Sequence, residues 1–336
     1  MNITIISDGA WGTALALVAV SNDHRVTLWG PFPDYIEQMK QRRENIRFLP
    51  GRPLPGELTL TGNLTEAVAD ADIVILASPC QYMRQILSQL AAVPYPESAV
   101  YVNVAKGIEV GSLSRPQQIV KATLGSVSYA SLSGPSHAEE VSRALPTAVV
   151  VSASELEVAR KVQDTLMNDN LRIYTSDDVI GVELGGALKN VFAVAAGICD
   201  GMGFGDNSKA ALITRGIVEM SRLGNVLGGK PETFAGLSGV GDLIATCISR
   251  HSRNRYVGEK LGQGRKLPDI QSDMGMAVAE GVKTAASAYQ LARRHNVETP
   301  IIDEVHATLY SGKAPQEAAR DLMTRSAKQE KVEIKA

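Results

Sequence analysis

The sequence predicts a two-domain α/β protein, in which a doubly wound parallel sheet is followed by an all-helical domain. The length of 336 residues favours two domains, since one domain typically spans about 150 residues. Short runs of apolar, often β-branched residues alternate with amphipathic stretches in the first half. Strand-like runs stop after about residue 180. We therefore expect an α/β domain over residues 1–180 and a helical domain over residues 181–336.

The expected strands of the first domain are continuous apolar runs at residues 3–6, 26–29, 72–77, 99–103 and 148–151. Amphipathic segments at residues 13–20 and 81–90 are expected to form connecting helices. Strands without polar alternation are typical of parallel sheets whose two faces are both covered by helices. The order of the elements therefore predicts a doubly wound sheet.

The second half of the chain shows helical periodicity in five segments, at residues 183–196, 209–227, 253–261, 284–294 and 315–322. The glycine-rich segment that carries Asp242 is expected to be a flexible connection. The charged tail over residues 328–336 is expected to be frayed.

The composition argues against several classes of protein. With 34 Lys and Arg against 36 Asp and Glu, the net charge of −2 does not favour nucleic acid or an anionic membrane as partner. Three widely spaced cysteines form no disulfide framework, and five scattered histidines show no metal spacing, so we expect no metal site. The amino terminus lacks a signal-peptide pattern, and no apolar run reaches about 20 residues. We expect a cytoplasmic protein without a membrane span.

A glycine-rich turn connects the first expected strand to the first expected helix. It reads Ser7-Asp8-Gly9-Ala10-Trp11-Gly12 and keeps the second and third glycines of the dinucleotide-binding fingerprint, with Ser7 in place of the first. Such a turn presents backbone amides and the positive end of the helix dipole to a pyrophosphate. The turn predicts a nicotinamide dinucleotide site despite its imperfect match.

The end of the second strand does not distinguish NAD from NADP. Gly30, Pro31 and Phe32 supply neither an acid for a ribose diol nor an Arg for a 2′-phosphate. We therefore expect a preference within about tenfold, with both cofactors weakened by Ser7 and by Asp8 near the pyrophosphate. Alternatively, Arg42 or Arg43 folds back and restores a preference for NADPH.

Two lysines stand in unusual settings. Lys106 follows an expected strand, at the sheet edge where ligands bind in open α/β folds. Lys189 lies on a helix so apolar that its ammonium must reach the surface or face a polar cavity. Lysines placed this way can hold an oxygen or transfer a proton.

Two polar clusters and one acid complete the candidate site. Ser133-Gly134-Pro135-Ser136 offers hydroxyl and amide groups to an oxyanion. Ser252-Arg253-Asn254 at a helix start is typical of a phosphate site, because Arg grips phosphate through two parallel hydrogen bonds. Asp242 could tune a catalytic lysine.

Together these segments closely resemble the bacterial type of the NAD(P)-dependent glycerol-3-phosphate dehydrogenase family, over about residues 3–325. The resemblance rests on several ordered stretches: residues 9–16, 104–109, 132–136, 188–191, 203–212, 228–236 and 252–255. The sequence departs from the family pattern at several positions. Ser7 and Asp8 replace a glycine and a small residue, and His137 and Phe48 replace a common Phe and a common Tyr, respectively. Pro31 and Phe32 stand where relatives usually carry basic residues near the adenosine.

The resemblance implies a Rossmann domain with NAD or NADP as cofactor, a helical substrate domain, catalysis in the cleft between them, and a homodimer. The activity would interconvert dihydroxyacetone phosphate and sn-glycerol 3-phosphate for glycerophospholipid synthesis. Lys189 matches the proton donor and acceptor, and Lys106 and Asp242 complete the catalytic set. The implied substrate-binding residues are Lys106, Gly134, Ser136, Lys189, Asp242, Ser252, Arg253 and Asn254. The implied cofactor-binding residues are Gly9, Ala10, Trp11, Gly12, Phe48, Lys106, Ala138, Arg253, Val278 and Glu280.

Two other readings remain open at this stage. A related two-domain 3-hydroxy acid dehydrogenase would need to recognise a carboxylate and would not need the cluster around Arg253. A nucleotide-sensing binding protein without catalysis would not need the intact Lys106, Lys189 and Asp242.

Overall fold

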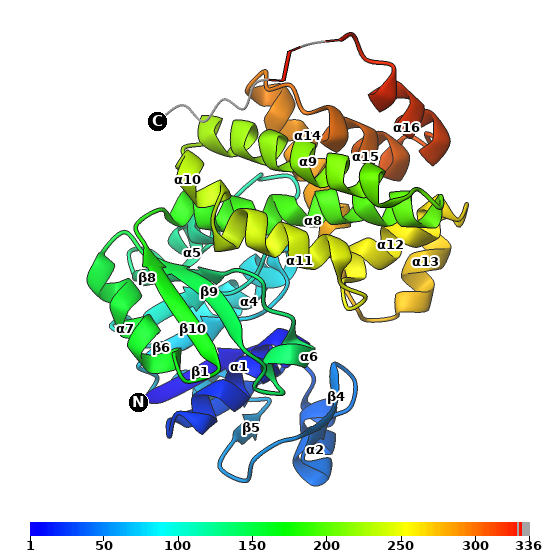
Figure 1. Ribbon diagram of the computed structural model, residues 1–336. Helices are drawn as coiled ribbons and strands as arrows, with labels where there is room; N and C mark the ends of the chain where they lie inside the picture. The colour runs from blue at the N-terminus through cyan, green and yellow to red at the C-terminus, as the bar shows by residue number, and fades with distance from the viewer. Residues whose placement is uncertain (328, 331–336) are drawn as a thin grey trace. The chain divides into compact units, whose positions relative to one another are not determined.

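The computed structural model describes residues 1–327, 329 and 330, and the chain divides into two compact units (Figure 1). The first unit comprises Met1–Ala105 and Pro116–Val179. The second comprises Lys106–Arg115 and the chain from Ile180 onward. Most of the tail that we expected to be frayed, 328 and 331–336, lies outside the described residues.

The first unit is built on one sheet of eight strands within the described chain. In spatial order they are β10 (Leu171–Ser176), β9 (Thr147–Ser152), β8 (Ser128–Ser133), β7 (Val100–Asn103), β6 (Ile73–Leu76), β1 (Asn2–Ile6), β2 (Arg25–Trp29) and β5 (Thr59–Thr61). A separate hairpin pairs β3 (Glu44–Asn45) with β4 (Leu49–Pro53). All five predicted strands are present, as β1, β2, β6, β7 and β9.

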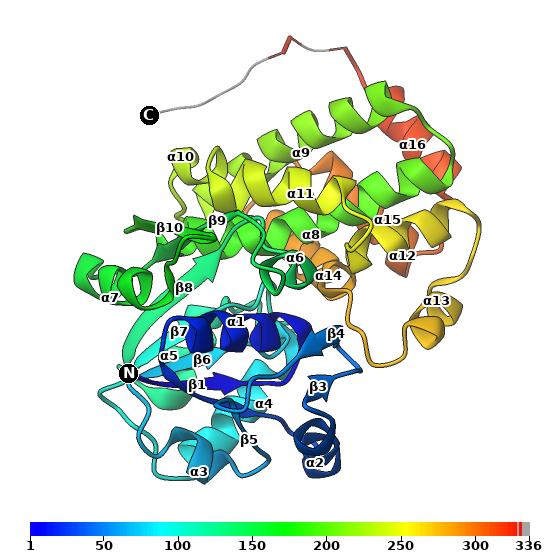
Figure 2. The same ribbon diagram turned by 60° about the horizontal axis from the view of Figure 1, so that its bottom comes forward.

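Helices cover both faces of this sheet, as a doubly wound fold requires. They are α1 (Ala10–Ser21), α2 (Pro33–Arg42), α3 (Leu64–Val68), α4 (Cys80–Ala91), α5 (Pro116–Leu124), α6 (Ala138–Val141) and α7 (Leu156–Leu166). Each face of the sheet packs against its helices in a separate hydrophobic core, and alternate residues of β1 point into these two cores. Ile3 and Ile5 pack with α1 and α7, whereas Ile6 packs with α3, α4 and α5. Figure 2 shows α1 lying along the strands on one side and α3 and α4 on the other.

The sheet is not fully parallel, which corrects our expectation. β9 pairs antiparallel with β8, with Ser131 opposite Ser152, and β10 then pairs parallel with β9. The connection from β8 to β9 contains only the single-turn helix α6. A parallel return generally requires a longer crossover with a full helix.

The backbone of the turn between β1 and α1 is strained at Ser7. Its φ of 102° lies in the left-handed region that L-residues other than glycine avoid. Gly12 is also required, because a Cβ there would stand 2.5 Å from the carbonyl oxygen of Ser7. The chain thus keeps the geometry of a glycine-rich turn although it lacks the first glycine.

Every regular element in the described residues of the second unit is a helix, and the segment Lys106–Arg115 contains no helix or strand. The elements of the unit are α8 (Val179–Gly201), α9 (Asp206–Val226), α10 (Pro231–Phe234), the π-helical turn η1 (Leu237–Gly241), α11 (Asp242–Ile248), α12 (Arg253–Gly262), α13 (Leu267–Met274), α14 (Glu280–Arg294), α15 (Pro300–Tyr310) and α16 (Pro315–Met323). All five predicted helices are present, as α8, α9, α12, α14 and α16.

The segment carrying Asp242 is helical, so our expectation of a flexible connection is wrong. It runs from η1 directly into α11. A Cβ at Gly239 would stand 2.0 Å from the carbonyl oxygen of Phe234, and a Cβ at Gly185 would stand 2.7 Å from that of Ser238. The glycines here allow close packing of backbones instead of flexibility.

Helix α8 runs through the core of the second unit, and both ribbon views show α9 and α12 beside it (Figures 1 and 2). Within the described chain it alone is long and apolar enough to cross a membrane by length and composition. However, 94% of its most apolar window is buried inside the protein. This burial accounts for its composition as that of a core helix.

One carboxylate in this unit is buried and held by backbone amides. Glu219 of α9 is 3% exposed, and its two oxygens accept hydrogen bonds from the backbone N–H groups of Ile301 and Ile302, at 2.7 and 3.2 Å. These amides belong to the first turn of α15, where a carboxylate is favoured by the helix dipole. Burial outweighs this effect and raises the pKa of Glu219 to about 7.

We predict that Ser7→Gly stabilises the protein by about 1 kcal/mol, because glycine adopts a positive φ without strain. The free energy of unfolding from denaturant titration measures this gain. Ser7→Ala is the matched control, since it removes the hydroxyl but keeps the Cβ and the strain. A glycine variant no more stable than the alanine variant would contradict the prediction.

We predict that Glu219→Gln reduces the pH dependence of stability. The native pKa lies above the ordinary value of 4.5, so the native state holds a proton that the unfolded chain releases. The contribution of Glu219 to stability is therefore fully present below pH 4.5 and is lost as the pH rises through about 7, by on the order of 3 kcal/mol in total. The uncharged variant should lack this fall. Unfolding free energies of both proteins at pH 5 and pH 8 test the prediction, and equal pH slopes would refute it.

Candidate functional site

Two lysines in the second unit share one buried carboxylate. The Nζ of Lys106 lies 2.7 Å from Oδ2 of Asp242, and the Nζ of Lys189 lies 2.9 Å from Oδ1. Lys106 begins the segment Lys106–Arg115, Lys189 comes from the middle of α8, and Asp242 is the first residue of α11. Three residues far apart in the sequence thus form one cluster, in which each carboxylate oxygen accepts from a different lysine.

Thr246 completes the contacts of Lys189. Its hydroxyl accepts a hydrogen bond from Nζ of Lys189 at 2.6 Å and lies 2.6 Å from the carbonyl oxygen of Asp242. Thr246 was not among the site residues predicted from the sequence. It lies four residues after Asp242, on the same face of α11, and that spacing was the available signal.

The electrostatics of the cluster follow from its burial. Burial lowers the pKa of the Lys106 ammonium to about 8, although the Asp242 carboxylate acts in the opposite direction. Burial would raise the pKa of Asp242, but the two lysines hold it below its ordinary value. Asp242 is therefore ionised at neutral pH. With both lysines protonated, two positive charges face one negative charge, an arrangement that favours an anionic or carbonyl oxygen.

Two asparagines connect the cluster to the start of α12. Asn190 donates to the carbonyl oxygen of Lys106 at 2.9 Å, and Asn254 donates to Oδ1 of Asn190 at 2.8 Å. Asn254 in turn accepts from the backbone N–H of Gly281 at 2.8 Å. Asn190 lies in residues 188–191, one of the stretches that carry the family resemblance, but it was not predicted as a site residue. Its role becomes visible only from its partners in space.

Several residues predicted to bind substrate or cofactor lie at the helix starts connected by this network. Ser252 is the N-cap of α12 and accepts a hydrogen bond from the backbone N–H of Arg255 at 3.2 Å. Arg253, the half-buried first residue of α12, follows it directly. Glu280 is the first residue of α14 and precedes Gly281, and Val278 lies two residues before Glu280. The negative charge of Glu280 raises the pKa of Lys106, against the effect of burial.

The other predicted residues belong to the first unit. Gly134 and Ser136 form a tight turn after β8, in which the Ser136 hydroxyl donates to the carbonyl oxygen of Gly134 at 3.0 Å. Ala138 begins α6, which packs against α1. Phe48 is held near the glycine-rich turn, because Asn45 accepts from its N–H at 3.1 Å and donates to the carbonyl oxygen of Asp8 at 2.7 Å.

The glycine-rich turn fits a dinucleotide. Gly9 is the N-cap of the twelve-residue helix α1 and has no side chain to cap it, so the amides of Ala10, Trp11 and Gly12 form an open helix start. A Cβ at Gly9 would meet no atom closer than 3.9 Å, which leaves room for a pyrophosphate at the backbone. The buried indole Nε1 of Trp11 has no hydrogen-bond partner.

The position of the turn in the sheet agrees with this use. Strand β1 pairs with β2 on one side and β6 on the other, so the strand order reverses at its carboxyl end. In doubly wound folds, ligands bind in the crevice at such a reversal. The residues of the turn could therefore hold the pyrophosphate of NAD or NADP.

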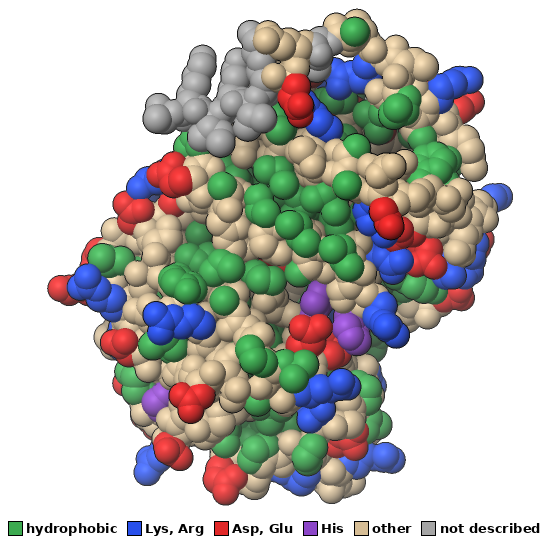
Figure 3. All heavy atoms as spheres, viewed as in Figure 1, with side chains coloured by type: hydrophobic (Ala, Val, Ile, Leu, Met, Phe, Trp, Pro, Cys, Tyr) green, Lys and Arg blue, Asp and Glu red, His purple; other side chains and the backbone are tan. Residues whose placement is uncertain are grey.

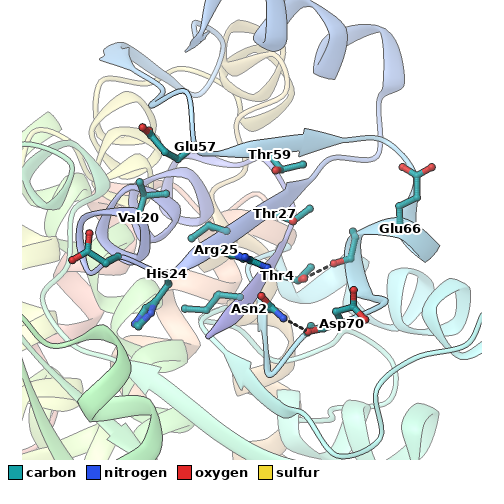
Figure 4. A pocket seen from close by; sticks show the side chains of 15 residues that line it. Asn2, Thr4, Val20, His24, Arg25, Thr27, Glu57, Thr59, Glu66 and Asp70 are labelled. Carbon is teal, nitrogen blue, oxygen red and sulfur yellow. Dashed lines mark hydrogen bonds between the residues drawn. The ribbon is translucent and has the colours of Figure 1, made fainter.

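A pocket also lies at the opposite edge of this sheet (Figure 4). It is lined by the amino-terminal ends of β1, β2 and β5 and by residues of α3, including Asn2, Arg25, Thr59 and Glu66. Asn2 donates to the carbonyl oxygen of Asp70 at 3.0 Å, as Figure 4 shows. Because α/β sheets place ligands at the carboxyl ends of their strands, this pocket is not the cofactor site. In the described part of the chain, no group of three His, Cys, Asp or Glu side chains is placed to hold a metal ion.

Comparison with known proteins gives one consistent result. The amino-terminal family model of NAD-dependent glycerol-3-phosphate dehydrogenase matches residues 2–159, and the carboxyl-terminal model matches residues 178–320. The chain is 47% identical over 333 residues to glycerol-3-phosphate dehydrogenase [NAD(P)+] of Chlorobium limicola, covering 98% of this chain and 99% of the relative. It is 48% identical to that of Bacillus subtilis, covering 96% and 94%.

A solved structure agrees with the sequence relatives. Glycerol-3-phosphate dehydrogenase of Coxiella burnetii superposes with a TM-score of 0.93 at 36% identity, covering 96% of this chain and 99% of the other. The matches span both units, including the glycine-rich turn and the lysine cluster. The chain therefore belongs to the NAD-dependent glycerol-3-phosphate dehydrogenase family.

Proposed function

We propose that the protein reduces dihydroxyacetone phosphate with NADH or NADPH and one proton, giving sn-glycerol 3-phosphate and the oxidised cofactor, and catalyses the reverse reaction. The pair of lysines on the buried Asp242 carboxylate is the observation that carries this proposal. A ketone needs a cationic group at its oxygen and a proton donor within reach. The cluster contains both.

The two lysines take different roles in this proposal. Lys106 binds the substrate oxygens through its ammonium group. Lys189 Nζ gives its proton to the carbonyl oxygen as the carbonyl carbon accepts the hydride that bound nicotinamide supplies. Asp242 and Thr246 hold Lys189 Nζ at 2.9 and 2.6 Å, so the donor is positioned before the substrate arrives. In the oxidation direction the same group takes the hydroxyl proton.

Arg253 is proposed to bind the substrate phosphate. It is the first residue of α12, a helix of ten residues whose first turn contains no acid. The helix dipole and the guanidinium both favour an anion there. Ser252, Asn254, Gly134 and Ser136 are proposed to add polar contacts to the substrate.

The proposed setting is the cytoplasm, with the product used in glycerophospholipid synthesis. Three free cysteines, two of them buried, suit a reducing compartment.

We also propose a homodimer. Figure 3 shows hydrophobic side chains gathered on the face that displays α9 and α11. Exposed members of these helices include Val226, Ile244 and Ile248, and such exposure is typical of association surfaces.

We predict that the wild-type protein oxidises NAD(P)H in the presence of dihydroxyacetone phosphate. The Lys189→Ala variant should have a kcat more than tenfold lower. Both proteins should still bind the dinucleotide. Loss of the only proposed proton donor raises the barrier. Lys189→Met keeps the aliphatic stem and should lose activity equally, and Lys283→Ala, at an exposed lysine of α14, should retain it. Retention of more than a tenth of kcat in either Lys189 variant would remove Lys189 from this role. Oxidation with acetoacetyl compounds, or no turnover with any substrate, would refute the activity.

We predict that Arg253→Lys raises KM for dihydroxyacetone phosphate about tenfold, because a single ammonium cannot replace the two-pronged guanidinium grip. The discriminating substrate is unphosphorylated dihydroxyacetone, whose kcat/KM should change little. The control is Arg265→Lys, at an arginine paired with Asp273 on the surface. If both ketones lose kcat/KM equally, Arg253 does not recognise phosphate.

A further inference from the structure

The side chain of Asp8 reaches from the glycine-rich turn to the end of the neighbouring strand β2. A Cβ placed on Gly30, the residue after β2, would lie 2.9 Å from Cγ of Asp8 and 3.0 Å from its Oδ2. The carboxylate therefore occupies the space beside the β2 end. We expected the charge of Asp8 near the pyrophosphate, and the structure places its carboxylate against Gly30.

This carboxylate is buried and incompletely satisfied. Asp8 is 3% exposed, and its Oδ2 has no hydrogen-bond partner among the residues that the structure describes. Burial raises the pKa of Asp8, which the charge of Arg47 partly counteracts. A buried carboxylate oxygen without a donor is costly, so a ligand hydroxyl that donates to it would be favoured.

The end of the second strand is where doubly wound folds read the adenosine ribose. An acid there accepts hydrogen bonds from the ribose hydroxyls of NAD. In this chain Gly30, Pro31 and Phe32 follow β2 and supply no acid. The absence of a side chain at Gly30 leaves the space that Asp8 fills from the turn after the adjacent strand β1.

We propose that Asp8 is the residue that selects the cofactor: its carboxylate accepts hydrogen bonds from the adenosine ribose 2′,3′-diol and repels a 2′-phosphate, so that the protein prefers NAD(H) to NADP(H). The inference rests on the proposed nicotinamide-dependent function and specifies its cofactor. The sequence alone predicts a preference within about tenfold, because it shows no acid at the end of β2.

Hydrogen bonds to the backbone fix Asp8 in this position. Its carbonyl oxygen accepts from Nδ2 of Asn45 at 2.7 Å and from the hydroxyl of Thr13 at 3.3 Å. Asn45 is fully buried and is also held by the hydroxyl of Tyr35 at 2.7 Å. The backbone from which the carboxylate projects is thus fixed, which limits the positions that its charge can take and supports discrimination.

The nearby arginines have other contacts. The guanidinium of Arg43 donates to the carbonyl oxygens of Leu54 and Leu58, at 3.2 and 3.1 Å, so it is held in the loop after β4. Arg42 ends α2 and is exposed. Arg47 stacks on the ring of Tyr35, with 4.0 Å from its guanidinium carbon to the ring centroid. Arg47 is the cation that could instead bind a 2′-phosphate, and the experiment therefore includes it.

The experiment titrates the full chain with NADH and with NADPH and follows nicotinamide fluorescence to obtain both Kd values. The wild-type protein should bind NADH at least tenfold more tightly. Asp8→Ala should reduce the ratio of the two Kd values at least tenfold, by weakening NADH and tightening NADPH. Asp8→Asn keeps the shape of the side chain without its charge and should also tighten NADPH. Asp34→Asn, at an exposed carboxylate of α2, and Arg47→Ala should leave the ratio unchanged.

Several results would overturn the inference. These are equal or tighter binding of NADPH by the wild type, an unchanged ratio in Asp8→Asn, a selective loss of NADPH in Arg47→Ala, or no binding of either dinucleotide. Thermal unfolding of each variant shows that it is folded, and if Asp8→Ala is not, Asp8→Asn carries the test. The expected Kd ratio without turnover of dihydroxyacetone phosphate would refute the proposed activity and leave the role of Asp8 intact.

Discussion

The second unit depends on one electrostatic constraint, the sharing of the Asp242 carboxylate by Lys106 and Lys189. Asp242 is 2% exposed and Lys189 6%, and charges at such depth are costly unless each has a partner. The close backbone packing around η1 brings the start of α11 against α8 and so places the carboxylate beside Lys189. Asn190 holds the backbone of Lys106 from the same helix. Much of the local architecture serves to keep three charged groups within hydrogen-bond distance.

Many features of the fold could be predicted from local pattern. Strands β1, β6 and β7 are continuous apolar runs because helices cover both of their faces. Strands β8 and β10 were missed because serines interrupt β8, and β10 alternates buried with exposed residues at the edge of the sheet. The antiparallel turn from β8 to β9 depends on the length of a connection, which apolar periodicity does not report.

Some residues of the candidate site could likewise be predicted from the sequence, and others could not. Lys189 could be selected because a lone charge on an apolar helix is conspicuous, and Arg253 because it stands beside a capping serine. Asn190 and Thr246 were not selected, since they contact Asn254 and Lys189, 64 and 57 residues away, and only the folded chain brings these partners together. The glycines before Asp242 were misread because loops and tightly packed helices both require them. Local sequence does not distinguish these two uses.

The segment Lys106–Arg115 has a consequence for how the chain can be divided. It lies in the sequence between two parts of the α/β unit, yet it belongs to the helical unit, where Ser287 donates to the carbonyl oxygen of Ile108 and Arg115 pairs with Glu183. The polypeptide therefore passes between the units three times. No single cut separates them, and a fragment beginning at residue 180 would leave Asp242 with one lysine instead of two. The helical unit is a structural module, but two separate segments of the sequence encode it. A single recombination point between two related genes therefore cannot transfer the whole helical unit.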